Sequence, residues 1–312
     1  MILEIRHIHK SYAEKQVLHD ISFAVHSHNT LGFLGRNGSG KTTTIRIIMG
    51  IIPADRGEVL IDGRAFQRSD FKMGYLPEER GLYQKVAILE QMVYFGQLKG
   101  MTAESARKSA LALLEKLAAS EYAQRSANTL SKGNQQKIQL AIALLNDPDI
   151  LILDEPFSGL DPVNAQVLKE VIEENARRSK IILFSSHQLE SVEEFCEDVC
   201  LIDQGQVILF GNLRDIKEAY PQEKLLIVPD RHGAARLQEA LDHDAQARQL
   251  ILTYEEEKNG FLVTLQDPQA KTALLHALTA SAVNAPLHSF AIAEPSLLEI
   301  FLEKVGGPHG EN

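Results

Sequence analysis

Cysteine, tryptophan and positive charge are all scarce in this sequence of 312 residues. It contains two cysteines and no tryptophan, and aromatic residues make up 6% of it. Cys196 and Cys200 lie four residues apart in a Glu-rich segment, and no further cysteine is present to complete a thiolate metal site. We therefore expect two buried, reduced thiols in a reducing compartment.

Long apolar runs are also missing. No stretch approaches the roughly 18 residues that a membrane-spanning helix requires. The first six residues, Met1 to Arg6, alternate like a strand and lack the charged start and apolar core of a secretory signal. We expect a chain that stays in the cytoplasm and does not itself cross a membrane.

The shortage of positive charge bears on possible partners. Asp and Glu number 42 against 32 Lys and Arg, which gives a net charge of -10. Nucleic-acid binding needs clustered Lys and Arg to neutralise phosphates, so nucleic acid is not expected as a main partner. The length suggests two domains of about 100 to 200 residues each.

One glycine-rich segment, GRNGSGKTT, fits the phosphate-binding loop pattern G-x-x-x-x-G-K-[ST] at every fixed position. Its residues are Gly35, Arg36, Asn37, Gly38, Ser39, Gly40, Lys41, Thr42 and Thr43. A short apolar strand at 30–34 precedes it and a helical pattern at 43–49 follows, which is the context that the motif requires. A chance match in a chain of this length has a probability of about 1%. The loop predicts a polyphosphate site in which Lys41 reaches the β and γ phosphates and Thr42 completes the coordination of Mg²⁺.

Acidic residues follow a second buried strand. The apolar run at 150–153 ends in Asp154 and Glu155, and carboxylates at the end of a strand rarely serve packing. We expect Asp154 to hold the Mg²⁺ shell and Glu155 to orient or deprotonate the attacking water. A further strand at 181–184 brings His187 to the same edge, where it is either an ordinary surface or core histidine or a hydrogen-bond donor to the γ phosphate.

Two other candidates have two interpretations each. Tyr12 lies in the predicted turn between strands at 2–9 and 17–25, where it either faces solvent or stacks on adenine. Ser131 caps a predicted helix that runs to about residue 145, with Gly133 beside it, and this is either a routine helix start or a second phosphate site. The region 88–119 is helical, with Thr102 as a cap and Leu111, Leu114 and Leu117 on one stripe.

Together these motifs resemble the ATP-binding subunit of an ABC (ATP-binding cassette) transporter over residues 1 to about 219. The resemblance implies that Tyr12 stacks on adenine and that residues 35–43 hold the phosphates of ATP. It makes the segment from Leu130 to Gln135, with Ser131 and Gly133, the signature that closes on ATP bound to a second copy. It also assigns Glu155 as the catalytic carboxylate, Asp161 as a dimer contact and His187 as the switch histidine.

The segments at 75–83, 130–133 and 156–164 are similar to the sodium-extruding NatA type and its drug-efflux relatives. This similarity implies an α/β fold of the P-loop NTPase class, with an antiparallel β subdomain and a helical insert at about 85–145. It implies an ATPase that uses ATP and Mg²⁺ and forms an ATP-sandwich homodimer. Such a subunit is peripheral on the inner face of the cell membrane and drives efflux of sodium, a drug or similar cargo through an integral membrane permease.

Two positions depart from the usual family pattern. Glu78 stands where most members have a glutamine that touches Mg²⁺ and the attacking water, so we list Glu78 with Thr42 and Asp154 as metal-binding candidates. Lys132 replaces the first glycine of the signature. Both departures bear on how fast the protein hydrolyses ATP.

Two alternatives belong to other functional classes. A soluble ABC ATPase acting on ribosomes or DNA would carry two cassettes or a long coiled-coil insert, and this chain has one cassette and a short helical insert. A regulatory subunit that only binds ATP is disfavoured by the intact Glu155 and His187.

Residues 220–312 form the second predicted domain. Strands and helices alternate in the order βαββαβ, the order of a ferredoxin-like unit, and a final helix follows at 295–305. The segment EPSLLEIF at 294–301 resembles the accessory domain that ends many such exporter subunits. We expect residues 306–312 to be a frayed end.

Overall fold

The computed structural model describes residues 1–79, 81–221, 223–280 and 285–306. The chain divides into two compact units, Met1–Leu213 with Lys304–Asn312, and Arg214–Glu303. The sequence places the boundary six residues later, at 219/220, whereas here nearly all of helix α7 (Leu213–Ala219) belongs to the second unit. Residues 307–312 of the predicted frayed end, and Arg80 in the family-like segment at 75–83, lie outside the described residues.

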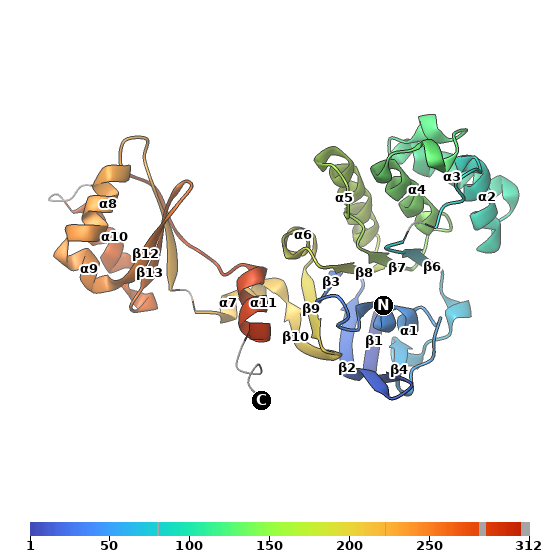
Figure 1. The fold of residues 1–312 in the computed structure, drawn as a ribbon, viewed down its shortest axis with the longest axis horizontal. Coiled ribbons are helices and arrows are strands. Elements are labelled where there is room, and N and C mark those ends of the chain that lie inside the picture. The colour runs from blue at the N-terminus through green and yellow to red at the C-terminus, as the bar shows by residue number, and fades with distance from the viewer. Residues whose placement is uncertain (80, 222, 281–284, 307–312) are drawn as a thin grey trace. The chain divides into compact units, whose positions relative to one another are not determined.

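A six-stranded sheet organises the first unit (Figure 1). Its strand order is β10-β9-β3-β8-β7-β6, with β10 antiparallel to β9 and the other neighbours parallel. The strands are β3 (Thr30–Leu34), β6 (Met73–Leu76), β7 (Ile150–Asp154), β8 (Ile181–Ser186), β9 (Asp198–Asp203) and β10 (Gln206–Asn212). β3, β7 and β8 are buried along their whole length, as expected for central parallel strands. Because these three strands run in parallel, their carboxyl ends meet at one edge of the sheet.

A separate antiparallel sheet has the order β2-β1-β4-β5. Its strands are β1 (Ile2–Tyr12), β2 (Lys15–His26), β4 (Arg56–Ile61) and β5 (Arg64–Ala65). β1 extends three residues beyond the predicted strand, so Tyr12 is its last residue, opposite Lys15, and does not lie in the turn. Asp55 explains the extension, because its carboxylate accepts hydrogen bonds from the Lys10 ammonium at 2.7 Å and from the Ser11 N–H at 2.6 Å.

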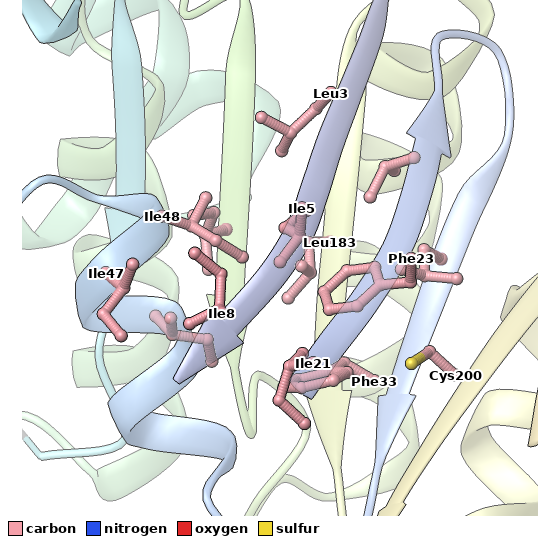
Figure 2. Close-up of a cluster of buried hydrophobic side chains, with 14 of the residues drawn as sticks. Leu3, Ile5, Ile8, Ile21, Phe23, Phe33, Ile47, Ile48, Leu183 and Cys200 are labelled. Atoms are coloured by element: carbon pink, nitrogen blue, oxygen red, sulfur yellow. The ribbon is translucent and has the colours of Figure 1, made fainter. Parts of the chain in front are cut away.

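The main core lies between these two sheets and includes helix α1 (Lys41–Ile48) (Figure 2). Alternate side chains of β1 and β2 point into it, and the rings of Phe23 and Phe33 stack with their centroids 5.2 Å apart. Ile47 and Ile48 of α1 join the same cluster. The segment between β3 and α1, which is the phosphate loop, is therefore fixed at both ends by buried apolar residues.

Helices lie on the opposite side of the six-stranded sheet from the antiparallel sheet (Figure 1). They are α4 (Lys132–Leu144), α5 (Pro162–Arg177) and α6 (Leu189–Phe195). Helices α2 (Ile88–Leu98) and α3 (Ala103–Lys116) pack against each other and against α4, farther from the sheet. Two three-residue 3₁₀ turns, η2 (Ser120–Tyr122) and η3 (Ala127–Thr129), lie between α3 and α4 in the sequence. Two others, η1 (Arg68–Asp70) and η4 (Pro268–Ala270), lie elsewhere in the chain. The predicted caps are confirmed, since the Thr102 side chain accepts from the N–H of Ser105 and the Ser131 side chain from the N–H of Asn134.

The predicted leucine stripe of α3 is only partly correct. Leu114 and Leu117 are fully buried, whereas Leu111 is 44% exposed. Spacing by three residues turns the helix by about 300° each time, so Leu111 and Leu117 lie about 120° apart around the axis. The face that packs inward instead follows the spacing of four, with Ala106, Ala110 and Leu114.

Lys99, just after α2, connects α2 to the end of α4. Its Nζ donates hydrogen bonds to the carbonyl oxygens of Ile142 at 2.7 Å and Ala143 at 3.0 Å. These carbonyls belong to the last turn of α4, where a cation interacts favourably with the helix dipole. Burial lowers the pKa of Lys99 to about 8.

The second unit has a four-stranded antiparallel sheet in the order β12-β13-β11-β14. Its strands are β11 (Lys224–Pro229), β12 (Ile251–Glu257), β13 (Gly260–Leu265) and β14 (Leu287–Ile292). Its helices after α7 are α8 (Ala234–His243), α9 (Ala245–Leu250), α10 (Lys271–Thr279) and α11 (Leu297–Gly306). The βαββαβ order is present, with α9 as an unpredicted addition. Six residues are too few for a periodic pattern, and the helix is started by the Asp244 side chain, which accepts from the N–H groups of Gln246 and Ala247.

Candidate functional site

The phosphate loop turns tightly between β3 and α1. Gly38 and Gly40 have φ of 80° and 109°, which side-chain-bearing residues rarely adopt. A Cβ at Gly40 would also come within 2.5 Å of the Leu18 side chain. Lys41 folds back over the loop, and its Nζ donates to the carbonyl oxygens of Gly35 at 2.5 Å and Arg36 at 3.2 Å.

One polar group of this loop, the Lys41 ammonium, fits an anionic ligand. It is held against carbonyl oxygens; burial lowers its pKa, and Glu155, Asp154 and Glu78 oppose that shift. A polyphosphate would supply acceptors to this ammonium and to the N–H groups at the start of α1. The loop therefore fits the phosphates of a nucleotide.

A cleft of about 180 Å³ opens beside the loop. It is lined by Val17, Asn37, Gly38, Gly40, Lys41, Thr42, Thr43, Glu78, Asp154 and Glu155. Residues that are far apart in the sequence are thus brought together as predicted, including the unusual Glu78. Val17 was not predicted, and as an apolar strand residue it carries no motif by which it could have been found.

Asp154 is the last residue of β7 and is 4% exposed. The Ser185 hydroxyl donates to its Oδ1, and the Tyr75 hydroxyl lies 3.5 Å from its Oδ2. Burial, followed by the Asp154 charge, raises the pKa of Tyr75 to about 12, so Tyr75 stays a neutral donor. Asp154 is thus a carboxylate held in one orientation at the floor of the cleft.

The oxygen donors around the cleft fit Mg²⁺. Thr42, Glu78 and Asp154 supply a hydroxyl and two carboxylates, the hard ligands that this ion prefers. Mg²⁺ commonly takes one or two protein carboxylates and completes its shell with substrate phosphates and water.

Glu155 and His187 are in direct contact. Glu155 Oε1 accepts from the His187 N–H at 2.7 Å and lies 2.7 Å from His187 Nδ1, which donates because a carboxylate can only accept. The Ser186 hydroxyl donates to Oε2 at 3.2 Å. Glu155 adopts a φ of 51°, in the left-handed region that non-glycine residues rarely occupy. Ser185 and Ser186 directly precede His187 in the sequence, and sequence reasoning did not identify their contacts with the two carboxylates.

Ser131, Gly133 and Asp161 form a second group at the starts of α4 and α5. Asp161 caps α5 by accepting from the N–H groups of Val163 and Asn164, and the Asn164 hydrogen bonds lower its pKa. A Cβ at Gly133 would approach the Asn164 side chain to 3.1 Å, so the two helix starts are closely packed. None of these three residues lines the cleft.

Tyr12 lies at the end of β1 and is 47% exposed, with the Lys10 Nζ 5.7 Å from its ring centroid. It does not line the cleft. Its stacking on adenine remains a prediction.

Two family models match the chain. The model described as ABC transporter matches residues 18–158, and the model described as ATP-binding protein DrrA1-3-like, C-terminal domain, matches residues 211–305. Each model falls almost entirely within one of the two compact units. Among the described residues, no helix is long and apolar enough to span a membrane.

Individual relatives extend the match. The uncharacterized ABC transporter ATP-binding protein YhaQ of Bacillus subtilis is 37% identical over 306 residues, covering 98% of this chain and 99% of YhaQ. The ABC transporter ATP-binding protein NatA of Bacillus subtilis is 34% identical and covers 67% of this chain and 87% of NatA. The solved dimeric structure of MJ0796, a bacterial ABC transporter cassette, is 25% identical with a TM-score of 0.62, covering 68% of this chain and 99% of the cassette.

These relatives confirm the resemblance to ABC transporter subunits of the NatA type and the predicted fold. They give no support to the alternative of a soluble ABC ATPase that acts on ribosomes or DNA. The chain belongs to the ABC transporter ATP-binding proteins, which bind ATP and hydrolyse it to power transport.

Proposed function

We propose that this chain is the motor subunit of an ABC exporter, in which two copies close on ATP and drive cargo through a separate membrane permease. One observation carries the proposal: the phosphate loop faces Glu78, Asp154 and Glu155 across one cleft, and His187 holds Glu155. This arrangement combines phosphate binding, oxygen ligands for a metal and a base for water.

Each group of residues has a role in hydrolysis. The loop from Gly35 to Thr43, with Lys41 at its centre, binds the phosphates and offsets their charge. Thr42, Asp154 and Glu78 hold Mg²⁺, which when bound neutralises charge on the β and γ phosphates. Glu155 takes the proton of the attacking water, and His187 keeps its carboxylate oriented until the γ phosphate arrives.

The second group of residues supports a composite site. Ser131, Gly133 and Asp161 lie at helix starts that do not line the cleft of their own chain. The family resemblance implies that a second copy brings the start of its helix α4 to the exposed side of the nucleotide, and one relative has been solved as a dimer. Two helix starts facing one γ phosphate place unpaired N–H groups on both sides of its charge. ATP then tightens the dimer and hydrolysis loosens it.

An exposed aromatic cluster supports docking to a membrane partner. Tyr83 and Tyr94 are 50% and 47% exposed, and Phe95 stacks against Tyr83 with ring centroids 5.8 Å apart. The buried amide of Gln91 holds the backbone of Tyr83, accepting from its N–H at 3.1 Å. Tyr83 follows Glu78 closely in the sequence, so a partner bound here would contact the segment that leads to this proposed metal ligand. Such a subunit works at the inner face of the cell membrane.

Replacing the two tyrosines tests the docking surface. Tyr83→Ala combined with Tyr94→Ala should reduce recovery of an integral membrane protein with the chain from native membranes by about tenfold or more, since aromatic anchors dominate interfaces. The ATPase activity of the isolated chain should persist. Leu252→Ala, at a residue that is 66% exposed in the other unit, is the matched control. Equal recovery of the same membrane protein with the double variant would reject this surface.

Glu78 supplies a further prediction. A carboxylate close to the γ phosphate is repulsive unless Mg²⁺ lies between them. Glu78→Ala should therefore raise the Mg²⁺ concentration needed for half-maximal hydrolysis more than it weakens ATP binding. Phosphate release measured across a Mg²⁺ series checks this, with nucleotide affinity measured in parallel. An unchanged Mg²⁺ dependence would show that Glu78 is not a ligand.

A further inference from the structure

Two consecutive serines end β8, and each contacts a different carboxylate of the cleft. Ser185 is fully buried and its hydroxyl donates to Asp154 Oδ1. Ser186 is 3% exposed and its hydroxyl donates to Glu155 Oε2 at 3.2 Å. Each of the two carboxylates therefore accepts a hydrogen bond from a different serine hydroxyl.

Backbone geometry produces this pairing. Asp154 lies directly opposite Ser185 in the parallel register of β7 and β8, so the two side chains share one face of the sheet. Glu155 leaves the strand with its positive φ, and its N–H still donates to the Ser185 carbonyl at 3.0 Å. Because successive residues of a strand point to opposite faces, Ser186 is free of Asp154 and reaches Glu155 instead.

The hydroxyl of Ser186 has a defined direction. It accepts the N–H of Gln188 at 3.0 Å, which leaves its own hydrogen for Glu155. On Glu155, Oε1 already carries both donors of His187, whereas Oε2 accepts, among the described residues, only from Ser186. Oε2 is thus the oxygen with acceptor capacity left for the proton of a water molecule.

Asp154 shows the same division between its two oxygens. Ser185 donates to Oδ1, and within the described part of the chain Oδ2 has only the long contact to the Tyr75 hydroxyl at 3.5 Å. A hydroxyl that fixes one oxygen of a carboxylate aims the other at its ligand, as outer-shell partners commonly do at metal sites.

We propose that Ser185 and Ser186 are positioning residues with separate tasks: Ser185 aims Asp154 at the magnesium ion, and Ser186 aims Glu155 at the attacking water. The inference rests on the proposed function, because it uses the roles given there to Asp154 and Glu155. It predicts that variants of these two neighbouring serines have different defects, one in the response to Mg²⁺ and one in kcat. A general loss of stability would not produce this difference.

The test compares single variants of the full chain. Affinity for a fluorescent ADP analogue is titrated with Mg²⁺, and kcat and KM are measured by phosphate release. Ser185→Ala should raise the Mg²⁺ midpoint of nucleotide binding by about tenfold or more, since outer-shell changes cost 10- to 100-fold in metal affinity or activity. Ser186→Ala should lower kcat by about tenfold with KM and the Mg²⁺ midpoint unchanged, and Ser186→Thr, which keeps the hydroxyl, should recover most of the rate.

Two controls separate the inference from other failures. Ser185→Cys keeps the shape of the side chain, with a somewhat larger sulfur atom and a much weaker donor, so it should show the Mg²⁺ defect of Ser185→Ala if the hydrogen bond is responsible. Thermal unfolding identifies any variant that does not fold. A wild-type Mg²⁺ midpoint in a folded Ser185 variant, or equal rates for the Ala and Thr variants of Ser186, would overturn the inference. Glu155→Gln in the same assays reports on the proposed function alone: wild-type turnover there rejects Glu155 as the base, whatever the serines do.

Discussion

Glu155→Gln is expected to keep ATP binding while lowering turnover by about 100-fold or more, because general-base catalysis contributes roughly 10²- to 10⁴-fold. The amide cannot take up the proton of the water. The phosphate loop and its Lys41 are untouched, so the affinity for ATP should stay close to that of the wild type. ATP should then hold the variant as a long-lived dimer, visible as a change in mass by light scattering.

Asp154→Asn is a useful comparison for this experiment. It alters the neighbouring carboxylate, so it should raise the Mg²⁺ concentration needed for nucleotide binding, a defect that Glu155→Gln should not share. Wild-type turnover in Glu155→Gln would exclude Glu155 as the base. Loss of ATP binding in that variant would instead show that the carboxylate supports the nucleotide site.

Mixing two inactive variants should restore activity. Lys41→Ala removes the phosphate-loop cation, and Ser131→Arg blocks the start of α4, so each homodimer carries the same defect in both composite sites. In a heterodimer, one site combines both damaged parts and the other combines two intact parts. Phosphate release should therefore partly return on mixing, provided that one intact site suffices.

The control for mixing is to combine each inactive variant with itself under the same conditions. Heterodimer formation is established by placing a different affinity tag on each variant and recovering both through one tag. If heterodimers form and the mixture stays inactive, the prediction is wrong: either the sites are not built from two chains, or one intact site does not work alone. Activity in the Ser131→Arg homodimer would show that α4 does not contribute to the site.

The candidate site could be predicted in outline because its parts depend on local rules. Gly38 and Gly40 impose the loop conformation, and the loop fixes where Lys41 can reach. Asp154, Glu155 and His187 follow parallel strands, whose carboxyl ends meet at one edge whatever the rest of the fold does. The cleft position of Glu78 came only from family resemblance, since no local pattern at that position indicates a ligand.

Other features depended on contacts that the sequence does not display. Val17 enters the cleft through the packing of the antiparallel sheet against α1 and β3. The end of β1 at Tyr12 depends on Asp55, 44 residues from Ser11 in the chain. The contacts of Ser185 and Ser186 depend on strand register and on the unusual φ of Glu155, both of which need the folded backbone.

The connection that Lys99 makes between α2 and α4 has a thermodynamic consequence. α2 carries Tyr94 and Phe95 of the proposed docking surface, and α4 begins at Ser131, the residue proposed to face the partner's ATP. Hydrogen bonds from the half-buried Lys99 join the two helices, so we expect a displacement of one to affect the other. Thermodynamic linkage then requires the two effects to be equal. If binding of the permease changes the affinity for ATP by some factor, binding of ATP must change the affinity for the permease by the same factor. Measuring either coupling therefore gives the other.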